Sequence, residues 1–140
     1  MKGAAPMRWL ILLLPLLIAG CSSDYAYQRE ANLQAHSVYP QNYRSEIVAL
    51  MRTYLNDPTG VRDASVSEPT QRALDGANRY FSCVRYTAKK TGGQYAPSRD
   101  SLVLFRSGRL ERIVDSEIMS RAQCKDAAYV PFPELQQMTR

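Results

Sequence analysis

The chain has 140 residues, of which 18 are Lys or Arg and 13 are Asp or Glu, so its formal net charge is +5. This length suits one small domain. A protein that binds nucleic acid concentrates its basic residues on one face. The nearest approach here is Arg106, Arg109 and Arg112, which Glu111 and Asp115 interrupt. We interpret these residues as a solvated strand face and expect no nucleic-acid partner.

The amino terminus combines a short basic start with an apolar segment. Lys2 and Arg8 are followed by residues 9–19, and the segment ends in Ile18-Ala19-Gly20-Cys21. It is shorter than the roughly 20 residues that a membrane-spanning helix needs, and it matches the apolar core of a signal peptide. Its last four residues resemble the lipobox of bacterial lipoproteins, with isoleucine in place of the commoner leucine.

This resemblance implies that residues 1–20 are a lipoprotein signal peptide, cleaved before Cys21, and that acyl chains such as palmitate are attached to Cys21. These covalent chains would anchor the protein in membrane lipid, and no other cofactor is expected. Ser22, directly after the cysteine, resembles the signal for release to the outer membrane in bacteria with two membranes. The alternative is an ordinary secretory leader in which Cys21 has no role.

The two other cysteines, Cys83 and Cys124, lie far apart in the sequence. In an oxidising compartment such a pair persists as a disulfide, and a bridge across this loop stabilises by about 4 kcal/mol if loop entropy dominates. The spacing is not that of a CxxC redox motif, and no neighbouring His or third Cys supports a zinc site. We predict a structural disulfide; two free buried thiols are the alternative.

Residues 21–40 have no sustained apolar period and can bury little surface, so we expect a flexible, lipidated tether. Its scattered tyrosines, among them Tyr25 and Tyr27, suggest an alternative in which they dock on the domain or the lipid surface.

Residues 41–140 read as a small α+β periplasmic domain that begins with an amphipathic helix. Asn42 is a suitable N-cap, and an apolar stripe runs through Tyr43, Ile47, Leu50 and Tyr54. Residues 56–60 contain the proline and glycine that end the helix. The polar face has few basic residues, so core packing is favoured over a membrane-surface or partner-binding helix.

Alternating apolar residues after Gly60, and a nearly all-apolar run at residues 102–106, predict short strands joined by turns. Residues 68–78 and 90–100 read as loops, Ser107-Gly108 as a tight hairpin turn, residues 116–122 as a short helix, and residues 134–138 as one helical turn. The predicted strands cover residues 61–67, 79–89, 102–106 and 109–114, with an extended segment at 129–133. We therefore predict two layers: one amphipathic helix packed on an antiparallel sheet of three to four strands, with a short C-terminal helix and one disulfide.

Catalytic patterns are sparse in this sequence. The single histidine, His36, falls in the predicted tether, and nucleotide-binding, zinc-protease and serine-hydrolase motifs are missing. Carboxylate pairs such as Glu111 with Asp115, or Asp57 with Asp63, are better explained as solvated surface charges. We expect a protein that is not an enzyme.

The residues most suited to recognition are aromatic. Tyr129 and Phe132 flank Pro131 on a rigid segment, and Tyr80 and Tyr86 share one face of a predicted strand. Large rings on rigid backbone are typical anchors of protein interfaces. The alternative is that these rings cover the edge or the face of the sheet.

Two longer stretches, residues 39–43 with 54–58 and residues 128–135, resemble those of small uncharacterised alphaproteobacterial outer-membrane lipoproteins, a resemblance that implies no activity. An anchored domain with helices on a small sheet is also similar in architecture to outer-membrane assembly lipoproteins, although those begin with two helices. The leading hypothesis is a non-enzymatic protein that contacts an unknown envelope protein during envelope assembly or maintenance. The alternatives are a binding module for a small molecule or glycan, and a hydrolase of envelope polymer.

Overall fold

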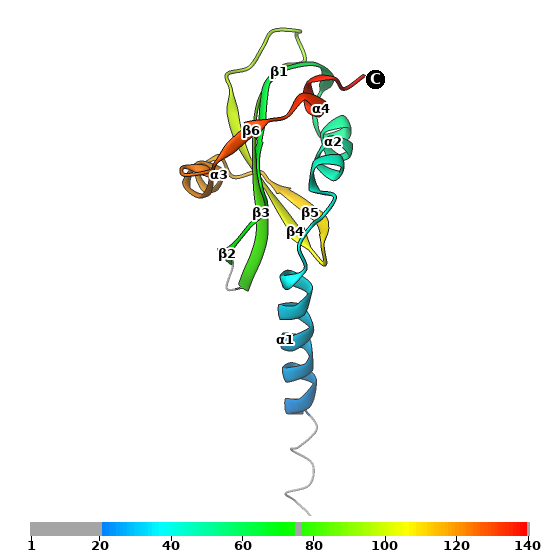
Figure 1. Ribbon diagram of the computed structural model, residues 1–140, viewed down its shortest axis with the longest axis vertical. Helices are drawn as coiled ribbons and strands as arrows, with labels where there is room; N and C mark the ends of the chain where they lie inside the picture. Colours follow the sequence, from blue (N-terminus) through cyan, green and yellow to red (C-terminus); the bar gives the residue numbers. More distant parts are fainter. Residues whose placement is uncertain (1–20, 75–76, 140) are drawn as a thin grey trace, which may run out of the picture. The chain divides into compact units, whose positions relative to one another are not determined.

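A computed structural model describes residues 21–74 and 77–139 of the chain (Figure 1). The predicted signal peptide lies outside these residues. The chain divides into two compact units, residues 1–32 and residues 33–140. The described residues form the helices α1 (Cys21–Ser37), α2 (Tyr43–Tyr54), α3 (Glu117–Cys124) and α4 (Pro133–Gln136), and the strands β1 (Asp57–Ser67), β2 (Thr70–Leu74), β3 (Ala77–Lys89), β4 (Arg99–Arg106), β5 (Arg109–Val114) and β6 (Tyr129–Pro131).

The first unit contributes the amino-terminal part of α1 to the described structure. We expected residues 21–40 to lack regular structure, but residues 21–37 are helical. Eight of the 17 residues of α1 are alanine, glutamine, glutamate, arginine or leucine. These residues have high intrinsic helix propensity, which explains a helix without an apolar stripe. The side chains of residues 24–32 are exposed. Among the described residues, no helix is both long and apolar enough to cross a membrane.

The second unit is built on an antiparallel sheet in the order β5-β4-β3-β1-β6, with β2 paired to β3 (Figure 1). The α+β class and the antiparallel sheet are confirmed, but the predicted size of three to four strands is wrong, because the described residues contain six. β2 was missed because four of its five side chains are exposed and therefore show no apolar alternation. β6 was predicted as extended and adds to the edge of β1.

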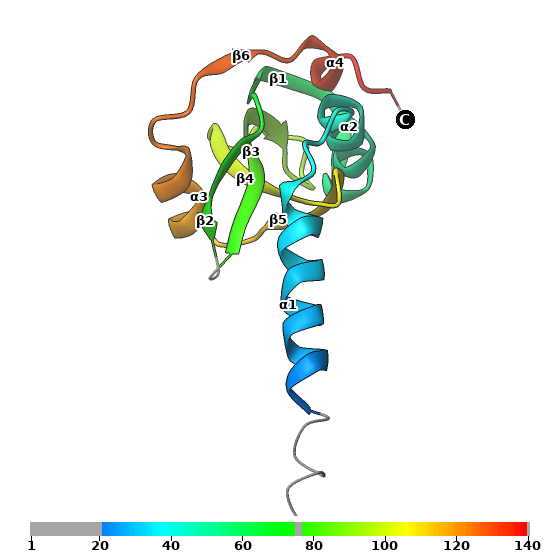
Figure 2. The same cartoon turned by 60° about the horizontal axis from the view of Figure 1, so that its bottom comes forward.

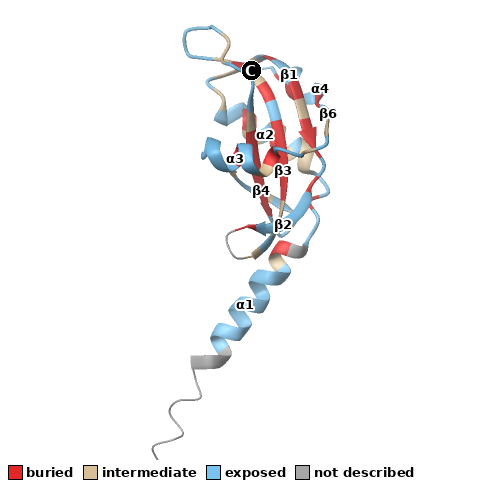
Figure 3. Cartoon of the chain, turned by 90° about the vertical axis from the view of Figure 1, so that its left-hand side faces the viewer, coloured by how far each residue is buried: buried red, intermediate tan, exposed pale blue. Residues whose placement is uncertain are grey.

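The two faces of the sheet bury different side chains, as the alternation along residues 79–89 predicted. Val84 and Tyr86 belong to one apolar cluster, whereas Phe81 and Cys83 belong to the other. Both clusters continue onto β4, where Val103 and Phe105 lie on the first face. The middle of both strands is buried accordingly (Figure 3).

Helices α2 and α4 cover the first face, and the apolar side of α2 is turned slightly from the predicted stripe. Ile47 and Met51 are fully buried in the first cluster, whereas Leu50 is only half-buried and Tyr54 is exposed. Figure 2 shows β6 leading into α4, which lies beside α2. Asn42 stands at the N-cap position as predicted, but its side chain makes no capping hydrogen bond.

Helix α3 covers the opposite face, so the domain has a third layer that the two-layer prediction did not include. The Ser116 Oγ accepts a hydrogen bond from the Met119 amide at 3.3 Å and caps this helix. The predicted disulfide is present: Cys83 on β3 is bonded to Cys124 at the end of α3, with 5.7 Å between the two Cα atoms. This bond holds α3 against the second cluster, which contains both cysteines.

The turn between β4 and β5 is the tight hairpin that Ser107-Gly108 predicted. Both residues have positive φ, 51° and 71°, as this turn type requires. A side chain at Gly108 would lie 2.8 Å from a methyl group of Val38. The glycine therefore allows the residues that follow α1 to pack against the hairpin.

We predict that Ile47→Ala lowers the free energy of unfolding by about 2–5 kcal/mol, because it leaves a cavity in the core. Leu50→Ala is the matched control on the same helix, and it should cost less than about half as much because Leu50 is only half-buried. Urea unfolding followed by circular dichroism measures both. Equal losses would show that α2 packs through the other side of its stripe.

Candidate functional site

The four aromatic residues expected at an interaction surface have different environments. Phe132 and Tyr86 are 0% and 2% exposed and belong to the core, so the prediction that they form a surface is wrong. Both lie on the face of the sheet that α2 and α4 cover, where apolar area is removed from water. Tyr80 is half-buried, with its ring 5.4 Å from that of Tyr39 in an edge-to-face arrangement. The alternative, that these rings cover the sheet, is the one observed for Tyr86 and Phe132.

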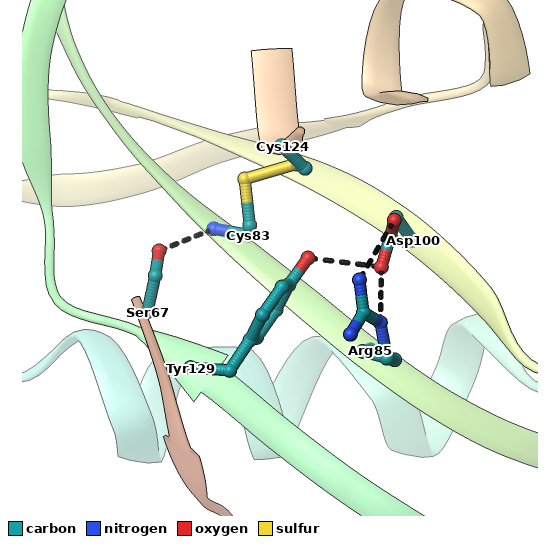
Figure 4. A network of polar contacts seen from close by, with 6 residues as sticks. All are labelled: Ser67, Cys83, Arg85, Asp100, Cys124 and Tyr129. Carbon is teal, nitrogen blue, oxygen red and sulfur yellow. Dashed lines mark hydrogen bonds and ion pairs between the residues drawn. A yellow bond between two sulfur atoms is a disulfide. The ribbon is translucent and has the colours of Figure 1, made fainter. Parts of the chain in front are cut away.

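Tyr129 is half-buried and belongs to a polar network on the opposite face of the sheet (Figure 4). Its hydroxyl donates a hydrogen bond to Asp100 Oδ1 at 2.9 Å. Arg85 donates to both oxygens of the same carboxylate, at 2.8 and 3.3 Å, and its guanidinium carbon lies 4.2 Å from the centroid of the Tyr129 ring. The network thus joins β3, β4 and β6.

The protonation states of this network are fixed by the same contacts. Burial alone raises the pKa of Asp100, but the hydrogen bonds from Arg85 and Tyr129 outweigh it and hold the pKa below its ordinary value. Burial, together with the hydrogen bond to Asp100, raises the pKa of Tyr129 well above its ordinary value. At neutral pH Asp100 is therefore an acceptor and Tyr129 a donor, a stable structural pair rather than an acid and a base.

Ser67 and the disulfide complete the network beside Tyr129 (Figure 4). Ser67 is the last residue of β1, and its Oγ accepts a hydrogen bond from the Cys83 amide at 2.9 Å. Cys83 also carries the bond to Cys124. As a result the end of β1, the end of α3 and the start of β6 are all held against the same part of β3.

A hollow of about 310 Å³ opens beside this network. It lies where β6 begins and where the chain passes from β1 to β2. Apolar groups contribute much of its lining, and Glu68, Arg72 and Asp126 add charged groups. The lining residues are Ser67, Glu68, Thr70, Arg72, Phe81, Gln123, Asp126, Ala127, Ala128 and Val130.

The strand next to this hollow, β2, has an open edge. Among the described strands it pairs with β3 alone, through Thr70 with Phe81 to Leu74 with Ala77. Sequence reasoning missed this strand and placed it in a loop. The signal that could have revealed it is Asp75-Gly76, because this dipeptide between two extended segments favours a two-residue hairpin, and the register leaves two residues between Leu74 and Ala77.

A second hollow, of about 570 Å³, lies at the other end of β3. Three basic residues, Lys89, Lys90 and Arg99, line it together with Tyr54 and Tyr86. Lys89 lies 3.9 Å from a carboxylate oxygen of Asp57. The hollow is therefore basic and partly aromatic.

Two of the carboxylates considered for acid–base chemistry, Glu111 and Asp57, have structural partners. Glu111 lies 3.0 Å from Arg79 and 4.0 Å from Arg106. Asp57 accepts hydrogen bonds from the amide and the hydroxyl of Thr59, at 3.0 and 2.6 Å. Among the described residues, no group of three or more His, Cys, Asp or Glu side chains is placed to hold a metal ion.

His36, expected in the tether, is 4% exposed. Within the described part of the chain, its Nδ1 has no hydrogen-bond partner. Burial, followed by the charges of Arg79 and Arg106, lowers the pKa of His36, although Glu111 and the Phe105 carbonyl act in the opposite direction. The neutral imidazole is therefore the form that fits the folded domain.

Comparison with protein-family models, curated protein sequences and solved structures finds no match for this chain.

Removal of the disulfide by Cys83→Ser with Cys124→Ser should lower the free energy of unfolding by about 2–5 kcal/mol, because α3 loses its covalent link to β3. Chemical unfolding of the purified protein measures this difference. Wild-type protein treated with a reductant is the control, and it should unfold at the same denaturant concentration as the double variant. An unchanged midpoint in both samples would mean that the bond adds nothing to stability.

The stability of the domain should fall as pH drops through about 6.5, because the unfolded chain then protonates His36 more readily than the folded chain does. The loss should level off below the folded pKa. His36→Gln cannot take up this proton, so its melting temperature should change less between about pH 7.5 and pH 5.5. Identical pH dependence in the two proteins would show that other groups are responsible.

Proposed function

We propose that the mature protein begins at an acylated Cys21, is anchored on the periplasmic face of the outer membrane, and acts without catalysis by contacting another envelope protein during envelope assembly or maintenance. Residues 21–32 link the anchor to the domain. The part of α1 in this segment makes the link a stiffer spacer than a random coil.

The observation that carries this proposal is the closed Cys83–Cys124 bond in a chain whose first residues resemble a lipoprotein leader. Disulfides persist in oxidising compartments outside the cytoplasm, which is where a lipobox directs a protein. The third cysteine, Cys21, has a separate proposed role as the site of acylation. The two features thus support the same compartment.

Action through protein contact is supported by a contrast between polar side chains that are paired within the fold and a strand edge that is not. Asp100, Tyr129 and Glu111 have strong partners within the fold, whereas the backbone edge of β2 and the adjoining hollow remain open to solvent. An exposed strand edge is a template for pairing with another chain. These features favour a binding surface over a hydrolytic centre.

One observation favours a second candidate function, the binding of a small molecule or glycan. The 570 Å³ hollow at Lys89, Lys90 and Arg99 has room for such a ligand, and its positive charges suit carboxylate or phosphate groups. Tyr54, at its wall, could stack on a sugar ring.

The anchor is tested by the intact mass of the protein isolated from membranes of a diderm bacterium. We expect a chain that begins at an acylated Cys21, with Cys83 and Cys124 resistant to alkylation until they are reduced. Cys21→Ser should remain unprocessed. An unacylated mature chain with two reactive thiols would overturn both the anchor and the compartment.

The contact is tested by crosslinking in intact cells followed by mass spectrometry of the adducts. We expect one or a few envelope proteins to be enriched with the wild-type protein. The control is a mature chain expressed in the cytoplasm without residues 1–20. Failure to capture an envelope protein with several crosslinking chemistries would contradict action through protein contact.

A further inference from the structure

We propose that the open edge of β2 binds an extended peptide segment of a partner protein, which adds to the sheet as a further strand. The preferred segment has an acidic residue beside Arg72 and an apolar residue two positions away in the hollow next to Thr70. This inference rests on the proposed function, because it names the surface and the kind of partner through which the contact is made.

The edge of β2 differs from the two outer edges of the sheet. β6 is three residues long and contains Pro131, which has no amide hydrogen to offer. On β5, the Leu110 amide donates to the Glu46 carboxylate from α2. β2 has neither protection within the described structure: it contains no proline, and its only strand partner is β3. Alternate residues of such a strand direct their amide and carbonyl groups outward, where a peptide backbone can pair with them.

The hollow gives this edge a pocket for one side chain. Thr70 pairs directly with Phe81, so their side chains lie on the same face of the sheet. Both residues line the hollow, together with Ala127, Ala128 and Val130. The residue of an added strand that neighbours Thr70 on this face would therefore enter this hollow, much of whose lining is apolar.

Arg72 supplies charge complementarity at the next position on the same face. It is exposed, and within the described residues it forms no ion pair; its guanidinium carbon lies 5.6 Å from the centroid of the Phe81 ring. Its cross-strand neighbour is Arg79, which is paired with Glu111. An acidic residue on the open side of Arg72 would form a cross-strand ion pair and offset the repulsion between the two arginines.

The charges of Arg72, Glu68 and Asp126 determine how the peptide aligns with β2 and which kind of chain can bind there. Because strand residues two apart share a face, the acidic and apolar residues must be separated by one position. Glu68 and Asp126 line the hollow and disfavour an acidic group inside it. A second copy of this chain is less suitable, because antiparallel pairing centred on β2 would place Arg72 opposite itself.

The test uses the full chain in detergent micelles and a fluorescein-labelled octapeptide of threonine and serine with one glutamate and one leucine two positions apart. Fluorescence anisotropy should show saturable binding. Arg72→Glu should weaken it roughly fivefold, as expected for loss of one cross-strand ion pair, and a peptide with lysine in place of glutamate should restore it. Arg52→Glu makes the same charge change at an exposed position on α2, away from β2, and should leave the affinity unchanged.

Ala73→Pro tests the backbone pairing, because it places a proline ring on the open edge of β2, and it should abolish binding. If Ala73→Pro lowers the melting temperature, its loss of binding is not informative, and the proposal is then judged only by the charge exchange at Arg72. Equal affinity of the wild type and Arg72→Glu for both peptides would overturn the proposal. So would binding no stronger than that of a scrambled peptide, or a dimer that Ala73→Pro dissociates. None of these results changes the mass of the anchored chain or the crosslinked partners, so the proposed function is judged separately.

Discussion

The long strand β3 is the element on which the rest of this domain depends, because it is buried on both faces. Val84 and Tyr86 face the helices α2 and α4, whereas Phe81 and Cys83 face α3. A sheet that is apolar on both sides must be covered on both sides. One helix therefore cannot complete the core, and the Cys83–Cys124 bond fixes the second covering helix at the strand itself.

β1 and β2 both pair with β3, and the chain between them has one residue more than the part of β3 that it faces. Val66 pairs with Val84 and Thr70 pairs with Phe81, so residues 67–69 face only residues 82–83. This extra residue is a bulge, and Pro69 within it has no amide hydrogen to pair. The Ser67 hydroxyl accepts the hydrogen bond of the Cys83 amide instead. The bulge divides the neighbour of β3 into one strand that receives β6 and one strand whose outer edge stays open.

The parts of the fold with strong local signals were predictable from the sequence. Apolar alternation identified β3, and a nearly all-apolar run identified β4. Ser107-Gly108 identified the hairpin turn, where both residues have positive φ, and the two remaining cysteines identified the disulfide. The missed parts depend on tertiary contacts. β2 has almost no apolar pattern, the third layer follows from burial on both faces, and the burial of Phe132 and His36 depends on residues distant in the sequence. For the same reason, aromatic content alone pointed to the wrong surface, and the open edge became visible only with the strand register.

The low intrinsic stability of β2 means that a strand bound at its open edge would also stabilise β2 itself. Four of its five side chains are exposed, and a two-stranded ribbon that extends past its core is marginally stable by itself. A third strand would satisfy the outward backbone groups of β2 and would bury the apolar side of the hollow. Free energy of binding would then also stabilise the ribbon, since a ligand that binds only the folded form shifts the folding equilibrium. The disulfide and the polar network beside β2 already hold α3 and β6 against β3. The stabilisation that follows from binding is therefore confined to β2 and the end of β3 that pairs with it.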